Sequence, residues 1–131
     1  QRKYQVIVFI PLHTSKIMLP RIKKVEFRNV HIDDDVHTDN DLFLFSHGIE
    51  TVDAARRPTV KDFDKMLLHE PEAAVFGIGF KKKLQIDSKI LDAAKKNNVE
   101  LHVLSTPEAA KKFQELARKG KKVVAKLHIT C

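Results

Sequence analysis

The sequence contains one cysteine, Cys131, so it cannot form an internal disulfide. Its stability therefore does not depend on an oxidising compartment. No uninterrupted apolar run reaches about 18 residues, the length that a membrane-spanning helix needs. The opening QRKYQVIVFIPL has a basic start and a short apolar run, but Pro11 and His13 interrupt it and no small-residue cleavage pattern follows. We expect a cytoplasmic or organelle-matrix protein with no membrane span.

Tryptophan and tyrosine, two of the aromatic residues that stack on bases, are also scarce, since the chain has no tryptophan and one tyrosine. The formal charge is +7, which would attract nucleic acid, anionic lipid or an acidic protein. However, the basic residues occur as scattered doublets, which is typical of solvated helix surfaces. We do not expect nucleic acid to be a partner.

The first half of the chain predicts strands. KKVEFRNVHI alternates around Val25 and Phe27 and ends at an aspartate turn, residues 33–35. DLFLF is a second apolar run, and SHG predicts a hairpin turn into IETVDA. These hairpins, between about residues 22 and 55, predict a small N-terminal antiparallel layer.

From residue 73 onward the pattern changes to β-α-β-α-β. A helix capped by Thr59 precedes this part, and Asp87 or Ser88 starts the next helix after AAVFGIG. In STPEAAKKFQELARKG, Thr106 is expected to be the N-cap, Pro107 the first helical residue and Gly120 the left-handed stop. The sequence therefore predicts an α/β fold with a mixed central sheet flanked by helices. We expect one domain over residues 21–131 and an N-terminal extension of uncertain role at 1–20.

The clearest candidate site is an anion-binding crevice where two predicted strands end. GIGFKK follows one strand, and the helix start at Ser105–Thr106 follows the other. Backbone amides and helix N-termini favour anions at the carboxyl ends of parallel strands. The alternative is that the glycines only permit a tight turn and Thr106 only caps its helix. The candidate ligand-binding residues are Gly77, Gly79, Lys81, Lys82, Ser105 and Thr106, with Lys83, Arg56 and Arg57 as additional charges.

Other familiar sites are not indicated. A dinucleotide fingerprint fails because Lys82 occupies the third glycine position. A calcium loop started at Asp33 fails because Thr38 replaces the required glycine. The terminal LHITC places His128 and Cys131 at odd spacing, so they point to opposite faces of an extended strand. We predict no catalytic residues, no metal site and no cofactor, and we leave open whether the protein is an enzyme.

The stretch AAVFGIGF, followed by LHVLSTPEAAKKFQELARKGKKVVAKLHITC, resembles the domain-of-unknown-function 498 family over about residues 22–131. The resemblance implies a compact α/β/β domain and no established reaction. Better-understood members include a mitochondrial complex I assembly factor, so it also implies action through partners, with a mitochondrial matrix or membrane-associated role as the alternative location. Many members carry a Gly-Thr-x-His segment where this chain has AARRPTVKD.

Two functions follow from these observations. The first is a non-enzymatic protein-interaction domain, an assembly factor or regulatory scaffold with an unidentified protein partner. The alternative is a protein that binds an anion or phosphorylated metabolite, either as a binding protein or as an undiscovered enzyme, through the Gly77–Gly79 and Ser105–Thr106 crevice. The sequence leaves the oligomeric state open.

Overall fold

The structure, a computed structural model, describes residues 20–45, 48–54, 57–81 and 85–129. In these ranges the chain forms eight strands and three helices. In chain order they are β1 (Ile22–Glu26), β2 (Asn29–Ile32), β3 (Asp35–Thr38), β4 (Asp41–Phe45), β5 (Gly48–Val52), α2 (Val60–Leu67), β6 (Ala73–Gly77), α3 (Ser88–Lys96), β7 (Glu100–Leu104), α4 (Thr106–Arg118) and β8 (Val123–Leu127). None of the helices in the described ranges has the length and apolar character needed to cross a membrane.

The strands form two sheets. β1, β2 and β3 make a three-stranded antiparallel sheet, and the other five strands make a mixed sheet in the order β5-β4-β8-β6-β7. β6 pairs in parallel with both β7 and β8, while β4 runs antiparallel to β5 and β8. The predicted mixed central sheet and its β-α-β-α-β part are confirmed.

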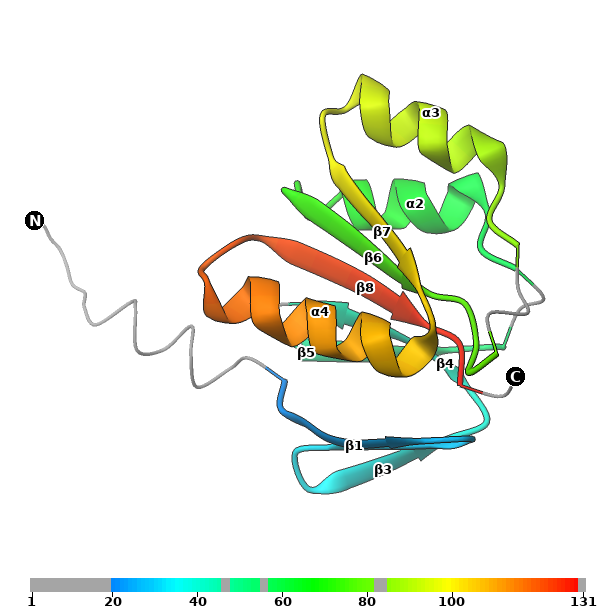
Figure 1. Cartoon of the computed structure of the whole chain (residues 1–131), viewed down its shortest axis with the longest axis vertical. Helices are drawn as coiled ribbons and strands as arrows, with labels where there is room; N and C mark the ends of the chain where they lie inside the picture. Colours follow the sequence, from blue (N-terminus) through cyan, green and yellow to red (C-terminus); the bar gives the residue numbers. More distant parts are fainter. Residues whose placement is uncertain (1–19, 46–47, 55–56, 82–84, 130–131) are drawn as a thin grey trace, which may run out of the picture.

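The elements are stacked in layers. α2 and α3 cover one face of the five-stranded sheet, and α4 covers the other, with the three-stranded sheet beside α4 (Figure 1). Gln114 of α4 ties the small sheet in place, because its amide group donates to the Ile22 carbonyl and accepts from the Ile22 N–H, each at 3.2 Å. The Arg28 N–H also donates to the Ile129 carbonyl at 2.7 Å.

Two details of the predicted N-terminal layer were wrong. The run at residues 23–32 is two strands, because the chain turns at Phe27–Arg28 and Arg28 adopts φ of 67°. A left-handed arginine is rare and has no sequence signal comparable to glycine. The predicted hairpin of β4 and β5 exists, with Phe45 opposite Gly48, but β4 pairs with β8 and so joins the central sheet.

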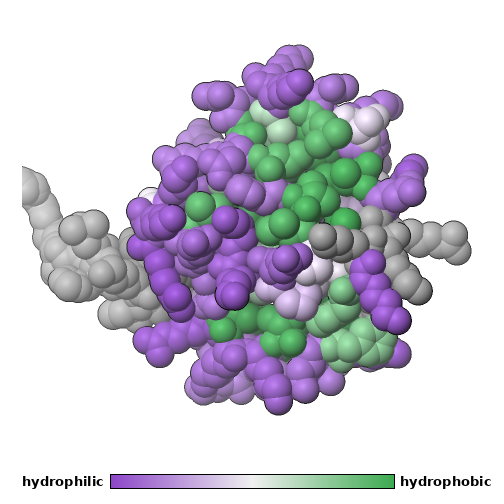
Figure 2. Space-filling model, viewed as in Figure 1, coloured by the Kyte–Doolittle hydropathy of each residue, from purple (hydrophilic) through white to green (hydrophobic). Residues whose placement is uncertain are grey.

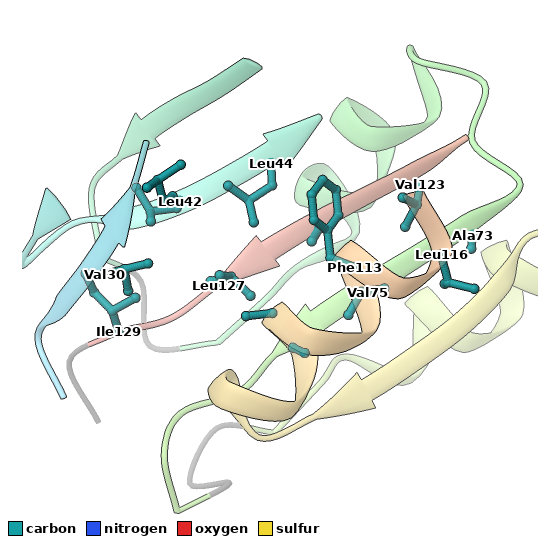
Figure 3. Packing of buried hydrophobic residues seen from close by; sticks show 14 residues of the cluster. Val30, Leu42, Leu44, Ala73, Val75, Phe113, Leu116, Val123, Leu127 and Ile129 are labelled. Carbon is teal, nitrogen blue, oxygen red and sulfur yellow. The ribbon is translucent and has the colours of Figure 1, made fainter. Parts of the chain in front are cut away.

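The core has two halves, one on each face of the five-stranded sheet. The half under α4 is centred on Phe113, which packs against strand residues that include Val75 and Leu127 (Figure 3). The half under α2 and α3 contains Phe63 and Phe76. Alternation along each central strand sends successive side chains to opposite halves, which is why β4, β6 and β8 are apolar except for Asp41 and Lys126.

Candidate functional site

The carboxyl ends of β6, β7 and β8 meet at one edge of the sheet. Gly77 lies opposite Leu104 of β7 on one side and Leu127 of β8 on the other. The helices that follow β6 and β7 cover opposite faces of the sheet, so this edge is the topological switch point at which α/β proteins commonly bind ligands. Of the six predicted site residues, the structure brings four together here: Gly77, Gly79, Ser105 and Thr106.

Hydrogen bonds within the protein join the two loops of this junction. The Gly79 N–H donates to Thr106 Oγ1 at 3.0 Å, and the Thr106 N–H donates to the Gly79 carbonyl at 3.1 Å. Thr106 Oγ1 in turn donates to the His128 carbonyl at 2.5 Å. The buried Thr106 hydroxyl therefore links the ends of all three parallel strands. An anion at this junction would have to displace these bonds.

The glycines of the junction have separate roles. A Cβ at Gly77 would lie 3.0 Å from Leu127 Cδ2 and 3.1 Å from Thr106 Cα, so this glycine allows α4 to approach β6 closely. Gly79 has φ of 103°, a conformation that other residues rarely adopt. Both glycines thus have a structural reason to be present.

The helix start differs by one residue from the prediction. Ser105, not Thr106, is the N-cap of α4, and Thr106 is its first helical residue. The Ser105 hydroxyl donates to Glu108 Oε1 at 2.8 Å and accepts from the Glu108 N–H at 3.4 Å. This reciprocal arrangement leaves the Thr106 hydroxyl available for the loop after β6.

The predicted basic residues add little to the junction. Lys81 and Arg57 are exposed. Lys82, Lys83 and Arg56 lie outside the described residues.

A buried polar row, which we call the Asp41 row, lies on the α2 face of the sheet and was not predicted. Asp41 Oδ1 is 2.8 Å from His128 Nδ1, and Asp41 Oδ2 is 3.6 Å from Lys126 Nζ. Lys126 Nζ also lies 3.2 Å from Asp62 Oδ2. The side chains of Asp41, His128 and Lys126 are at most 6% exposed. Lys126 therefore lies between two carboxylates, those of Asp41 and Asp62, and Asp41 lies between Lys126 and His128.

The Asp41 row fixes α2 on the sheet. Asp62 of α2 accepts from the Thr59 N–H at 2.8 Å, so the carboxylate that pairs with Lys126 also stabilises the first turn of the helix. The sequence did contain a signal for this row. Asp41 alternates with Phe43 on β4 and Lys126 with Val124 on β8, so charged residues fall on buried strand faces.

The part of the chain that the structure describes contains no group of three histidine, cysteine, aspartate or glutamate side chains arranged to hold a metal ion. The aspartates between 33 and 41 are dispersed. Asp33 occupies a turn with φ of 53°, Asp39 pairs with Arg28 at 2.8 Å, and Asp41 belongs to the buried row.

A third feature is the outer edge of β7, the last strand of the five-stranded sheet. The Glu100 N–H donates to the Glu72 carbonyl, and the Leu104 carbonyl accepts from the Ile78 N–H, each at 2.9 Å. Glu100 and Leu104 therefore turn their backbone groups toward β6. Alternation along the strand turns those of Leu101 and Val103 outward, where no strand of the described residues pairs with them.

The side chains along this edge are half-buried and largely apolar. Leu101 and Val103 belong to the α3 side of the sheet. Figure 2, which views the molecule from this side, shows apolar surface over α3 and β7. On the α4 side, His102 Nε2 lies 2.5 Å from Glu100 Oε2. That hydrogen bond, and then the charge of Lys121, lower the pKa of Glu100.

A groove of about 780 Å³ runs along α4 and meets this edge at Leu104. It is lined by Leu104, Glu108, Lys111, Lys112, Gln114, Glu115, Arg118 and Lys119. The charges alternate in sign along α4: Glu108 lies near its start, Lys111, Lys112 and Glu115 follow, and basic Arg118 and Lys119 lie at its end.

Comparisons with known proteins agree with this architecture. The conserved hypothetical protein PH1505 from Pyrococcus horikoshii OT3 superposes with a TM-score of 0.71 at 24% identity, covering 85% of this chain and 99% of that one. A Mth938-like domain from Bordetella pertussis gives 0.69 at 12% identity, covering 98% and 93%. Xanthomonas campestris XCC1710 gives 0.67 at 15%, covering 85% of each chain. At these identities the likeness concerns the fold alone.

A search of curated proteins gave no match. The family profile described as "Protein of unknown function (DUF498/DUF598)" matches residues 22–128, which span all eight strands and all three helices of the described part. The chain therefore belongs to this family, as the resemblance in its last strands and helices indicated.

Proposed function

We propose that this domain is a non-enzymatic protein-interaction domain, an assembly factor or regulatory scaffold, that acts through the outer edge of β7. The observation that carries the proposal is that the backbone N–H and C=O groups of Leu101 and Val103 point away from β6, at an edge of the sheet whose side chains are largely apolar. Unpaired strand edges readily accept another strand, and extended segments of partner proteins commonly bind in this way.

The chain does little to protect this edge. Natural edge strands are commonly blocked by proline, bulges or charged side chains that prevent pairing. β7 contains no proline, and its pairing with β6 runs in register from Glu100 to Leu104 without a bulge. Its one charged residue, Glu100, is at the start of the strand. Leu101 and Val103 thus offer backbone groups flanked by apolar side chains.

Val103→Pro is expected to abolish partner binding without unfolding the domain. Proline removes the outward N–H of residue 103 and keeps the bonds to β6, which Glu100 and Leu104 contribute. The measurement is affinity capture from native lysate, followed by quantification of stoichiometric partners. Thermal melting establishes that the variant is folded.

The matched control is Val36→Pro on β3, an edge strand of the other sheet. Val36 is 52% exposed and lies next to the hairpin-closing pair Ile32–Asp35, so its N–H points away from β2. We expect Val36→Pro to capture the same partners as the wild type. Equal capture by the wild type and by folded Val103→Pro would contradict the proposal.

Anion binding at the strand ends is the second candidate function. It is favoured by the convergence of Gly77, Gly79 and Thr106 at the switch point. The hydrogen bonds that already engage the Gly79 and Thr106 amides count against it.

A phosphate titration followed by amide NMR shifts distinguishes the two functions. Because the donors at the junction are engaged, we expect phosphate to leave the NMR shifts of the amides of residues 77–79 and 105–108 unchanged (residue 107 is proline and has no amide hydrogen). Saturable shifts of these amides, absent from the Lys23 and Lys24 amides on β1, would support the anion-binding function instead.

A further inference from the structure

The occupant of the β7 edge can be specified further, on the assumption that the proposed function is correct. We propose that a second copy of this chain pairs its own β7 antiparallel with this one, so that two five-stranded sheets join into one continuous sheet. The interface is symmetric about a two-fold axis that passes beside His102.

The register of this pairing follows from the outward backbone groups of β7. Only residues with outward backbone groups can form the hydrogen-bonded pairs of an antiparallel ladder. Here these are Leu101 and Val103. Placing Leu101 opposite the second copy's Val103, and the reverse, satisfies all four outward groups of each strand. The two His102 residues then face each other as a non-hydrogen-bonded pair on the dyad.

Side-chain chemistry on the α3 side matches this register. A two-fold axis perpendicular to the sheet keeps the faces aligned, so Leu101 packs beside the second copy's Val103 and each buries the other's exposed part. α3 also packs on β7 and exposes 46% of Leu91. Pairing brings the two α3 helices toward each other and so covers more of the apolar surface seen in Figure 2.

Charge on the α4 side matches as well. Because the dyad reverses direction, the start of one α4 lies nearest the end of the other. The groove beside α4 contains Glu108 at one end, Lys111, Lys112 and Glu115 along it, and Arg118 and Lys119 at the opposite end. Across the dyad, the Glu108 end of each α4 therefore lies toward the Arg118 and Lys119 end of the other. A parallel arrangement would place like charges together.

The opposite end of the sheet is less suited to pairing. Its edge strand β5 exposes Glu50 and Thr51, and Glu50 is held by Lys65 at 2.6 Å. A polar strand with a side chain engaged by α2 offers less apolar surface for a second copy. This contrast favours β7 as the self-association edge.

The test is site-directed disulfide formation in the full chain carrying Cys131→Ser, so that no other thiol is present. Non-hydrogen-bonded partners lie about 4.5 Å apart at Cα, within the range for a disulfide. His102→Cys should therefore form an intermolecular disulfide under mild oxidation. The matched control is Glu100→Cys, whose two copies would be about 13 Å apart along the strands and should stay monomeric on a non-reducing gel.

Sedimentation velocity over a concentration series of the wild-type chain provides the second readout. We expect a species of twice the monomer mass that disappears in folded Val103→Pro and persists in Val36→Pro. Disulfide formation by Glu100→Cys but not His102→Cys would overturn the register. A wild-type chain that is monomeric at all concentrations would overturn the dimer.

The same data separate this inference from the proposed function. If the chain is monomeric and lysate partners are still lost with Val103→Pro, the edge binds another protein and the second-copy inference fails alone. If Val103→Pro changes neither self-association nor partner capture, the proposed function itself fails.

Discussion

Asp41→Ala is expected to lower the free energy of unfolding by about 3–5 kcal/mol, the usual cost of removing one partner from a buried charge pair. Asp41 is 1% exposed and contacts both His128 and Lys126. Lys126 keeps Asp62, but that carboxylate is partly exposed and also caps α2. Chemical denaturation at neutral pH measures the loss.

Asp39→Ala is the matched control for this change. Asp39 pairs with Arg28 at 2.8 Å, yet both side chains are more than half exposed. Exposed pairs contribute about 0–1 kcal/mol. If Asp41→Ala costs no more than Asp39→Ala, the Asp41 row does not stabilise the fold. A double-mutant cycle with Lys126→Met would then measure the coupling between Asp41 and Lys126 directly.

The second large effect is expected for Thr106→Val, which keeps the side-chain shape and removes the hydroxyl. The Gly79 N–H would lose its acceptor and the His128 carbonyl its donor, both in the interior. A buried polar group without a partner costs roughly 1–3 kcal/mol, so we expect a loss of about 2–4 kcal/mol. Amide exchange at Gly79 should accelerate in parallel, and NMR follows both.

Thr106→Ser is the control, because serine restores the hydroxyl and gives up only a methyl group. It should recover most of the stability and the slow exchange at Gly79. A valine variant as stable as the serine variant would show that the Thr106 hydroxyl does not hold the ends of the three strands together.

Local sequence signals predicted the second half of the fold well. The capping residues Thr59 and Asp87 and the stop at Gly120 begin and end helices where expected, because these residues act through neighbours a few positions away. The turn at Arg28 was missed because its left-handed conformation has no residue preference to mark it. The pairing of β4 with β8 was missed because it joins segments about eighty residues apart, which no local pattern specifies.

The candidate sites also contain some features that the sequence could predict and others that it could not. The meeting of Gly77 with Thr106 follows from parallel strands that end together, and so it could be predicted. Their mutual hydrogen bonds could not, because they depend on which hydroxyl faces the loop. The Asp41 row depends on strand register across the sheet. The open edge at β7 depends on strand order, since the same sequence in a central position would have both of its edges covered.

Strand order also affects how the chain folds. β8 follows every other described element in sequence but occupies the middle of the sheet, between β4 and β6. Until residues 123–127 are available, the β4–β5 hairpin and the β6–β7 pair each present an additional open edge. Such late, non-local pairing slows folding and prolongs the exposure of apolar edges. A growing chain therefore stays in two unjoined halves until its last described strand is synthesised.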